Sequence, residues 1–105
     1  MKREVRPSAI NGTVCAPASK SIAQRAIALA SLSIGESTIN YPGTSADVQS
    51  AINVCKNLGV EIQIFPDRLI VKGGIKPPRK ALNCGESGLG IRIFSCIAAT
   101  LNAPV

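Results

Sequence analysis

Charged and hydroxyl side chains cluster at the start of one apolar stretch, Pro17-Ala-Ser-Lys20-Ser-Ile-Ala-Gln-Arg25. Ser21 and Arg25 are four residues apart, so on a helix they share one face, and Lys20 falls in the first turn. A lysine at a helix N-terminus opposes the helix dipole, so it is a poor choice for stability alone. A phosphate or carboxylate ligand would resolve this conflict, because free backbone N–H groups, an ammonium and a guanidinium would all face it. Spacing alone leaves open the alternative of a capped helix whose polar residues simply face water.

A second candidate site is the glycine-rich segment Gly85-Glu-Ser-Gly88-Leu-Gly90-Ile-Arg92. Glycines at a helix start let backbone N–H groups approach an anion closely, and Arg92 would lie one turn further along. The segment matches neither a P-loop nor a dinucleotide-binding fingerprint. It differs by one residue from the nucleophile-elbow pattern G-x-S-x-G, because Leu89 replaces the last glycine. We therefore expect Ser87 to be an N-cap.

The charge balance indicates anionic partners and restricts the possible chemistry. The 105 residues include 12 Lys and Arg against 6 Asp and Glu, a formal charge of +6, and no histidine. Phosphate esters, carboxylates, nucleic acid and acidic membrane surfaces all fit this charge. Without histidine, catalytic triads and His-ligated metal sites cannot form within the chain. Any catalysis must use Lys, Arg, Asp, Glu, Ser or Cys.

The cysteines indicate reduced core thiols rather than a metal site. Cys15, Cys55, Cys84 and Cys96 form no C-x-x-C pair, so we expect no metal and no cofactor. All but Cys84 lie in apolar runs, where free cysteine usually fills a core position. Reduced thiols are typical of a cytoplasmic protein. No uncharged stretch reaches bilayer length, so we expect no membrane partner.

The first 72 residues show alternating strand and helix patterns. We predict a strand over 12–16, a helix over 20–32, a strand over 36–40, a helix that begins after Thr44 or Ser45 and ends at Gly59, and strands over 60–64 and 69–71. The predicted core face of the first helix is Ile22, Ala26, Leu29 and Ala30, and that of the second is Val48, Ala51, Ile52, Cys55 and Leu58. Asp47 falls in the first turn of the second helix, where a negative charge suits the helix dipole.

The remaining residues predict the beginning of another unit of the same kind. Residues 73–80 form a basic Pro/Gly connector, followed by a strand over 81–84, a glycine-rich turn over 85–90 and a helix over 91–101. We predict one partial α/β (α+β) domain over 1–105: a β-α-β-α-β-β unit over 12–72, the connector, and the start of a second unit over 81–105. The basic connector also permits the alternative of a small nucleic-acid-binding module. Aromatic side chains that could stack on bases are nearly absent, which disfavours it.

The stretch Ala16-Pro-Ala-Ser-Lys20-Ser-Ile-Ala-Gln-Arg25-Ala resembles the N-terminal signature of the enolpyruvyl transferase family, specifically its EPSP synthase (3-phosphoshikimate 1-carboxyvinyltransferase) branch. The resemblance continues through Gly12, Ile34-Gly35-Glu-Ser-Thr-Ile, Ser45-Ala-Asp47-Val, Leu58-Gly59-Val and Gly85-Glu-Ser-Gly88-Leu-Gly-Ile-Arg92. It implies the inside-out α/β barrel of that family, which is built from β-α-β-α-β-β units in two domains. It also implies a transferase that moves the enolpyruvyl group of phosphoenolpyruvate to the 5-hydroxyl of shikimate 3-phosphate and releases phosphate, on the route to aromatic amino acids.

Carried over residue by residue, the resemblance assigns roles to several positions. Lys20 resembles the lysine that contacts phosphoenolpyruvate and takes part in proton transfer. Ser21 and Arg25 resemble the residues that hold shikimate 3-phosphate, the arginine on its carboxylate. Gly88 resembles the glycine whose missing side chain leaves room for phosphoenolpyruvate and for the herbicide glyphosate. The further site candidates in the matching segments are Asp47, Ser87 and Arg92.

The chain also departs from the family pattern. The family usually has Thr where Leu89 stands and often Asn where Glu86 stands. Its members are several-fold longer, and their second domain supplies acidic catalytic groups and further arginines. We therefore expect an N-terminal fragment that is inactive alone and needs the C-terminal part of the same enzyme. Residues up to about Ala18 are expected to be loosely held, because the first strands of the family belong with the second domain.

Overall fold

The computed structural model describes residues 2–78 and 81–101 of the chain. Within them the order of elements is α1 (Lys20–Leu32), β1 (Glu36–Asn40), α2 (Ala46–Asn57), β2 (Glu61–Ile64), β3 (Arg68–Lys72) and α3 (Gly88–Ala99). The predicted bounds of α1 and β1 are confirmed, and those of α2, β2 and β3 are confirmed to within two residues at each end. No helix in the described part of the chain is long and apolar enough to cross a bilayer.

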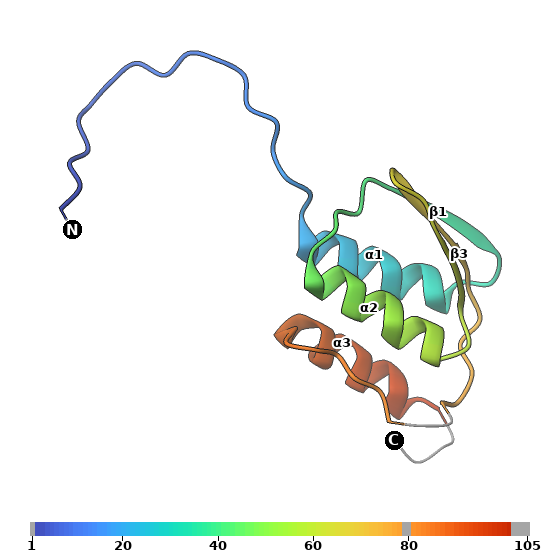
Figure 1. Cartoon of the computed structure of the whole chain (residues 1–105). Helices are drawn as coiled ribbons and strands as arrows, with labels where there is room; N and C mark the ends of the chain where they lie inside the picture. Colours follow the sequence, from blue (N-terminus) through green and yellow to red (C-terminus); the bar gives the residue numbers. More distant parts are fainter. Residues whose placement is uncertain (1, 79–80, 102–105) are drawn as a thin grey trace.

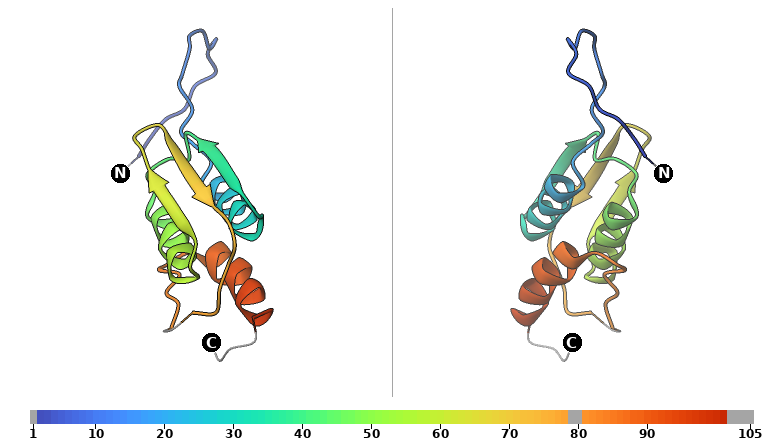
Figure 2. Two further views of the ribbon diagram at one scale, coloured as in Figure 1. Left: turned by 90° about the vertical axis from the view of Figure 1, so that its right-hand side faces the viewer. Right: turned by 90° about the vertical axis from the view of Figure 1, so that its left-hand side faces the viewer.

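The helices and the sheet form a layered body (Figures 1 and 2). α1 and α2 pack side by side, the sheet covers them on one side, and α3 packs against both helices away from the sheet. The largest fully buried side chains of the shared core include Ile27 of α1, Ile52 of α2, Leu69 of β3 and Phe94 of α3. Each helix therefore contributes to one aliphatic core with a single central aromatic ring.

The central strand of the sheet is β3. The strand order is β1-β3-β2, and β3 runs antiparallel to both neighbours. Leu69 pairs with Ile39 on one side and Ile64 on the other, and its buried side chain faces the helices. The β2–β3 hairpin closes where the Phe65 N–H donates to the Arg68 carbonyl oxygen over 2.9 Å. Buried and less buried side chains alternate along β3. One face of the strand therefore lies in the core, as the predicted strand pattern requires.

Two predicted strands are wrong. Residues 12–16 are exposed and belong to an extended arm that leads away from the body before α1 (Figure 1). Residues 81–84 run irregularly, with Leu82 and Cys84 half-buried against the core. A strand needs a neighbour to pair with, and neither segment finds one among the described residues. The predicted β-α-β-α-β-β order over 12–72 is thus observed as α-β-α-β-β over 20–72. That the segment up to Ala18 is loosely held stays a prediction, because exposure alone does not test it.

The predicted core face of α1 is correct only in part. Ala30 is buried and Ala26 is half-buried, but Ile22 and Leu29 are 65% and 66% exposed. The buried residues of α1 are mostly small or polar: Ala23, Gln24, Ile27, Ala28, Ala30 and Ser31. Small side chains let α1 lie close to its helical neighbours and to the sheet, so the larger apolar side chains are left outside. The predicted core face of α2 is confirmed in full.

The cysteine prediction is correct only for Cys55. Cys55 is buried, whereas Cys15 and Cys96 are exposed and Cys84 is half-buried. Burial raises the pKa of the Cys55 thiol from 9.0 to about 11, and a hydrogen bond with Ser31 acts in the opposite direction. The Cys55 Sγ atom lies 3.0 Å from the Ser31 hydroxyl, which also donates to the Ile27 carbonyl oxygen. Cys55 is therefore a structural thiol.

Candidate anion-binding site at the helix N-termini

All three described helices begin at the same end of the molecule, next to the root of the extended arm (Figure 1). Each has a serine N-cap: Ser19 for α1, Ser45 for α2 and Ser87 for α3. The hydroxyl oxygens accept hydrogen bonds from the N–H groups of Ile22, Val48 and Gly90, at 3.4, 3.3 and 2.8 Å. The positive ends of three helix dipoles therefore gather on one surface, which favours small anions.

Lys20 and Asp47 join the first turns of α1 and α2. The Lys20 Nζ atom lies 3.4 Å from the Asp47 Oδ2 atom, and the two side chains are 62% and 24% exposed. The carboxylate suits the start of α2 and offsets the unfavourable position of the lysine at the start of α1. The conflict seen in the sequence is thus partly resolved inside the chain, and Lys20 still presents most of its side chain to solvent.

Ser21 and Arg25 extend this surface along α1. Ser21 is half-buried and Arg25 is exposed one turn later, as the four-residue spacing predicts. Arg25 forms no salt bridge with any of the residues that the structure describes. Its guanidinium is therefore available for a planar anion such as a carboxylate, which it can bind through two parallel hydrogen bonds.

The start of α3 is held by a buried cap. Ser87 is the N-cap, as predicted, and α3 begins at Gly88 rather than at Ile91. The Ser87 hydroxyl also donates to the Gln24 Oε1 atom over 2.7 Å. Gln24 was not among the predicted site residues. The sequence could have pointed to Gln24 only through its polar side chain, which lies among the buried residues of α1. A buried polar side chain needs a hydrogen-bond partner inside the protein.

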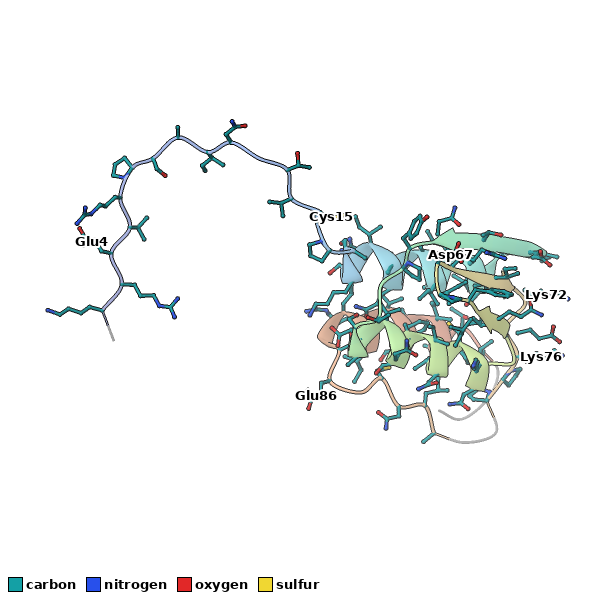
Figure 3. All side chains as sticks on the ribbon, turned by 45° about the horizontal axis from the view of Figure 1, so that its top comes forward. Glu4, Cys15, Asp67, Lys72, Lys76 and Glu86 are labelled. Atoms are coloured by element: carbon teal, nitrogen blue, oxygen red, sulfur yellow. The ribbon has the colours of Figure 1, made fainter. Side chains whose placement is uncertain are left out.

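Gly88 and Arg92 lie together at the beginning of α3. Gly88 is exposed, and a Cβ atom built on it would stand 3.9 Å from the Arg92 Nη2 atom. Glu86, at the first departure from the family pattern, extends into solvent at this end of the molecule (Figure 3). A second cationic group thus stands beside the open backbone of a helix start.

The basic connector lies elsewhere. Lys72 and Lys76 are at the opposite end of the molecule from Glu86 (Figure 3). Lys72 pairs with Glu61 at 3.9 Å, and the Lys76 N–H donates to the Leu58 carbonyl oxygen over 2.6 Å. These two lysines are therefore distant from the surface that the helix N-termini share.

Lys20, Ser21, Arg25 and Gly88 line neither of two hollows in the described part of the chain. One, of about 480 Å³ and mostly apolar, lies between the start of α2 and the β2–β3 turn. The other, of about 400 Å³ and more polar, lies along α2. No group of three or more His, Cys, Asp or Glu side chains gathers in the described part of the chain. Fold and surface together define an α/β protein with cationic side chains beside its helix N-termini.

Comparisons with known proteins give the family. The model of EPSP synthase (3-phosphoshikimate 1-carboxyvinyltransferase) matches residues 5–105. The chain is 40% identical over 105 residues to the 3-phosphoshikimate 1-carboxyvinyltransferase of Chlamydia felis, and 41% over 102 residues to that of Methanococcoides burtonii. These alignments cover 97% and 94% of this chain. The chain belongs to the EPSP synthase family.

The relatives are much longer than this chain. The alignments cover 24% of the Chlamydia felis protein and 24% of the Methanococcoides burtonii protein. The solved EPSP synthase from Acinetobacter baumannii shares the fold, with a TM-score of 0.70 at 23% identity over 80% of this chain and 20% of that one. The family match supports the enzyme hypothesis and lends no support to the nucleic-acid-binding alternative.

Proposed function

We propose that this chain is the N-terminal part of an EPSP synthase. The enzyme would transfer the enolpyruvyl group of phosphoenolpyruvate to the 5-hydroxyl of shikimate 3-phosphate and release phosphate, on the route to aromatic amino acids. The observation that carries the proposal is the family match over residues 5–105. The cationic surface at the three helix starts supports it, because both substrates are small and strongly anionic.

Lys20 and Gly88 would form the phosphoenolpyruvate side of the site. The Lys20 ammonium is mostly exposed, and its pairing with Asp47 holds it over the start of α2. There it would neutralise the charge of the phosphate that leaves and take part in proton transfer. Gly88 leaves the first turn of α3 uncovered, so that backbone N–H groups and Arg92 could face the same anion. Glyphosate would compete for this space.

Ser21 and Arg25 would form the shikimate 3-phosphate side. They lie one turn apart on α1, and both project from the helix that carries Lys20. The Arg25 guanidinium would bind the carboxylate, and the Ser21 hydroxyl would donate a hydrogen bond to the same substrate. The two substrates would then meet along one helix, which brings the attacking hydroxyl close to the enolpyruvyl group.

The architecture of this part of the enzyme would be the repeated unit of the family. In the longer enzyme, residues 12–16 would find the strand partners that they lack here and complete a β-α-β-α-β-β unit over 12–72. Residues 73–80 would connect it to a second unit that begins at 81. Two features support this arrangement: the arm is exposed, and Ile22 and Leu29 expose large apolar side chains on α1. A further part of the enzyme would cover these surfaces.

The chain alone would be inactive. The C-terminal part would supply the acidic catalytic groups, and closure of the two halves would exclude water from the reaction. Such closure is consistent with the exposure of Lys20, Arg25 and Gly88 in this chain. We expect a cytoplasmic enzyme that needs neither a metal nor a cofactor, with no nucleic-acid or membrane partner.

Phosphate release from the full-length protein tests the proposal. With phosphoenolpyruvate and shikimate 3-phosphate, the full-length protein should release phosphate, and the 105-residue chain should release none. A separately prepared C-terminal part should restore activity to the chain. Absence of turnover by the full-length protein would refute the proposed function, and turnover by the chain alone would refute its fragment character. Tight, salt-sensitive binding of oligonucleotides would favour the nucleic-acid alternative.

A further inference from the structure

One buried polar pair joins α1 to α3. Gln24 and Ser87 are 1% and 4% exposed, and the Ser87 hydroxyl donates to the Gln24 Oε1 atom over 2.7 Å. Two polar side chains are costly in a helix–helix contact unless they satisfy each other, and an apolar pair would pack there with less constraint. Because Gln24 and Ser87 satisfy each other, they can be buried together, and their hydrogen bond fixes how α1 and the start of α3 meet.

The Ser87 hydroxyl makes two hydrogen bonds at once. It donates its proton to Gln24 and accepts the N–H of Gly90 over 2.8 Å. Gln24 thus fixes the direction of the hydroxyl, and the hydroxyl fixes the first turn of α3. Gly90 completes the arrangement, because a Cβ atom there would stand 2.9 Å from the Ser87 Oγ atom and 3.4 Å from the Gln24 Oε1 atom.

The pair lies between the two groups of candidate residues. On α1, Gln24 is one turn after Lys20 and adjacent in sequence to Arg25. On α3, Ser87 immediately precedes Gly88. Lys20 is paired with Asp47 of α2. Among the described residues, the Gln24–Ser87 hydrogen bond is the side-chain hydrogen bond between α1 and the start of α3.

We infer that Gln24 and Ser87 are positioning residues that set the distance between Lys20 and the start of α3. This inference rests on the proposed function, in which Lys20 and Gly88 contact phosphoenolpyruvate, whereas Ser21 and Arg25 lie on α1 alone. Loss of the pair should loosen the phosphoenolpyruvate site and leave the shikimate 3-phosphate site intact. Neither Gln24 nor Ser87 needs to touch a substrate.

The test compares steady-state kinetics of the full-length protein with those of Gln24→Leu, Ser87→Ala and the double variant. Gln24→Leu keeps a side chain of similar volume but leaves the Ser87 hydroxyl without its acceptor. We expect it to raise the KM for phosphoenolpyruvate about tenfold and to change the KM for shikimate 3-phosphate less than about twofold. In the Ser87→Ala background the same change should have little further effect, because the two residues act as a unit. Ser95→Ala, an exposed serine on α3, is the matched control.

A merely structural role gives a different pattern. It would lower kcat through a smaller active fraction, or raise both KM values equally, and either result would overturn the inference. So would a Gln24→Leu effect that is as large in the Ser87→Ala background as in the parent protein. Ser87→Thr keeps the hydroxyl and should retain the parental KM for phosphoenolpyruvate.

A second measurement separates this inference from the proposed function. Inorganic phosphate is titrated into the full-length protein while the amide NMR signals of Lys20, Gly88 and Gly90 are followed. We expect the signals of both helix starts to report one binding event in the parent protein and a weaker one in Gln24→Leu. Phosphate binding unchanged by Gln24→Leu would overturn the positioning role. If the parent binds phosphate in this way but shows no turnover, the proposed function fails and the positioning role stands.

Discussion

The Lys20 Nζ atom lies 3.4 Å from the Asp47 Oδ2 atom, and this ion pair links the first turn of α1 to the first turn of α2. Sequence reasoning treated Lys20 as a cation whose unfavourable position indicates an external anion. Asp47 meets part of that need within the chain, so a bound phosphate would share or replace an existing partner. The lysine is held in place before any substrate arrives.

Lys20→Ala should abolish turnover in the full-length protein while barely changing its stability. A lysine in contact with the phosphate and in proton transfer contributes at least about 100-fold to the rate. An exposed ion pair contributes only about 1 kcal/mol or less to folding. Turnover and urea unfolding of the variant measure the two effects. Lys56→Ala, an exposed lysine in the last turn of α2, is the control. Near-normal turnover of Lys20→Ala would refute the assignment.

Gly88→Ala should weaken ligand binding without a loss of stability, whereas Gly90→Ala should lower stability. At Gly88 the new Cβ meets only the Arg92 Nη2 atom, 3.9 Å away, so the fold should be unchanged. The methyl group would nevertheless occupy the proposed phosphoenolpyruvate space, so the affinities for phosphoenolpyruvate and glyphosate should fall. At Gly90 the Cβ would press on the buried cap, so stability should fall by about 1–3 kcal/mol. Chemical unfolding and inhibition by glyphosate distinguish the two. Equal stability losses would contradict this account.

Gly73→Ala should destabilise the protein without involving the site. Gly73 follows β3 and passes close to the C-terminal end of α1, where its N–H donates to the Gly35 carbonyl oxygen. A Cβ atom there would overlap the Ser33 carbonyl oxygen and stand 2.5 Å from that of Ala30. Backbone atoms cannot swing aside as a flexible side chain does, so we expect a loss of about 1–3 kcal/mol in urea unfolding. Gly88→Ala is the matched control. If Gly73→Ala were as stable as the parent protein, that result would contradict the close approach of Gly73 to the C-terminal end of α1.

Stability should decrease in alkaline solution through Cys55. Its pKa is about 11 in the folded protein, against 9.0 for an unperturbed thiol. Because the folded pKa is the higher one, the contribution is complete below about pH 9 and is lost as the pH rises towards about 11. It amounts to roughly 2–3 kcal/mol. Unfolding under reducing conditions from neutral pH upwards should show this loss, and Cys55→Val should lack that part of it. Identical pH profiles for the two proteins would rule out the buried thiol as the cause.

Thiol labelling should divide the cysteines in the same way. In the native 105-residue chain, Cys15 and Cys96 are exposed and should react fast with a thiol reagent. Cys55 is buried and keeps its proton, so it should react only as fast as the protein opens. Mass spectrometry of quenched samples gives the rate at each site. Fast labelling of Cys55 would contradict the packing of α1 against α2.

Local signals predicted most of the elements. The α1 bounds follow from Ser19 as N-cap and from the apolar run behind it, and α2 begins at Ser45 for the same reason. Capping and periodicity act over a few residues, so they can be read along the chain. Ser87 as a cap was predicted too, although the glycines after it placed the expected start of α3 three residues late.

Nonlocal contacts account for the failures. The 12–16 segment has a good strand composition, but strand formation depends on a partner that composition does not reveal. The face of α1 was misjudged because Ile22 and Leu29 look like core residues, whereas the packing of α1 against α2, α3 and the sheet favours its small residues. Gln24 was overlooked because its partner, Ser87, is 63 residues away.

The amino-acid sequence by itself determined the family, the capped helix starts and the cationic residues beside them, because these depend on residue type and short spacing. Tertiary structure alone decided that the three helix starts share one surface, that Asp47 holds Lys20, and that Gln24 and Ser87 join α1 to α3. Those relationships depend on how distant segments pack around a common core. Short spacing constrains neighbours on one helix, but only packing sets the distance between different helices.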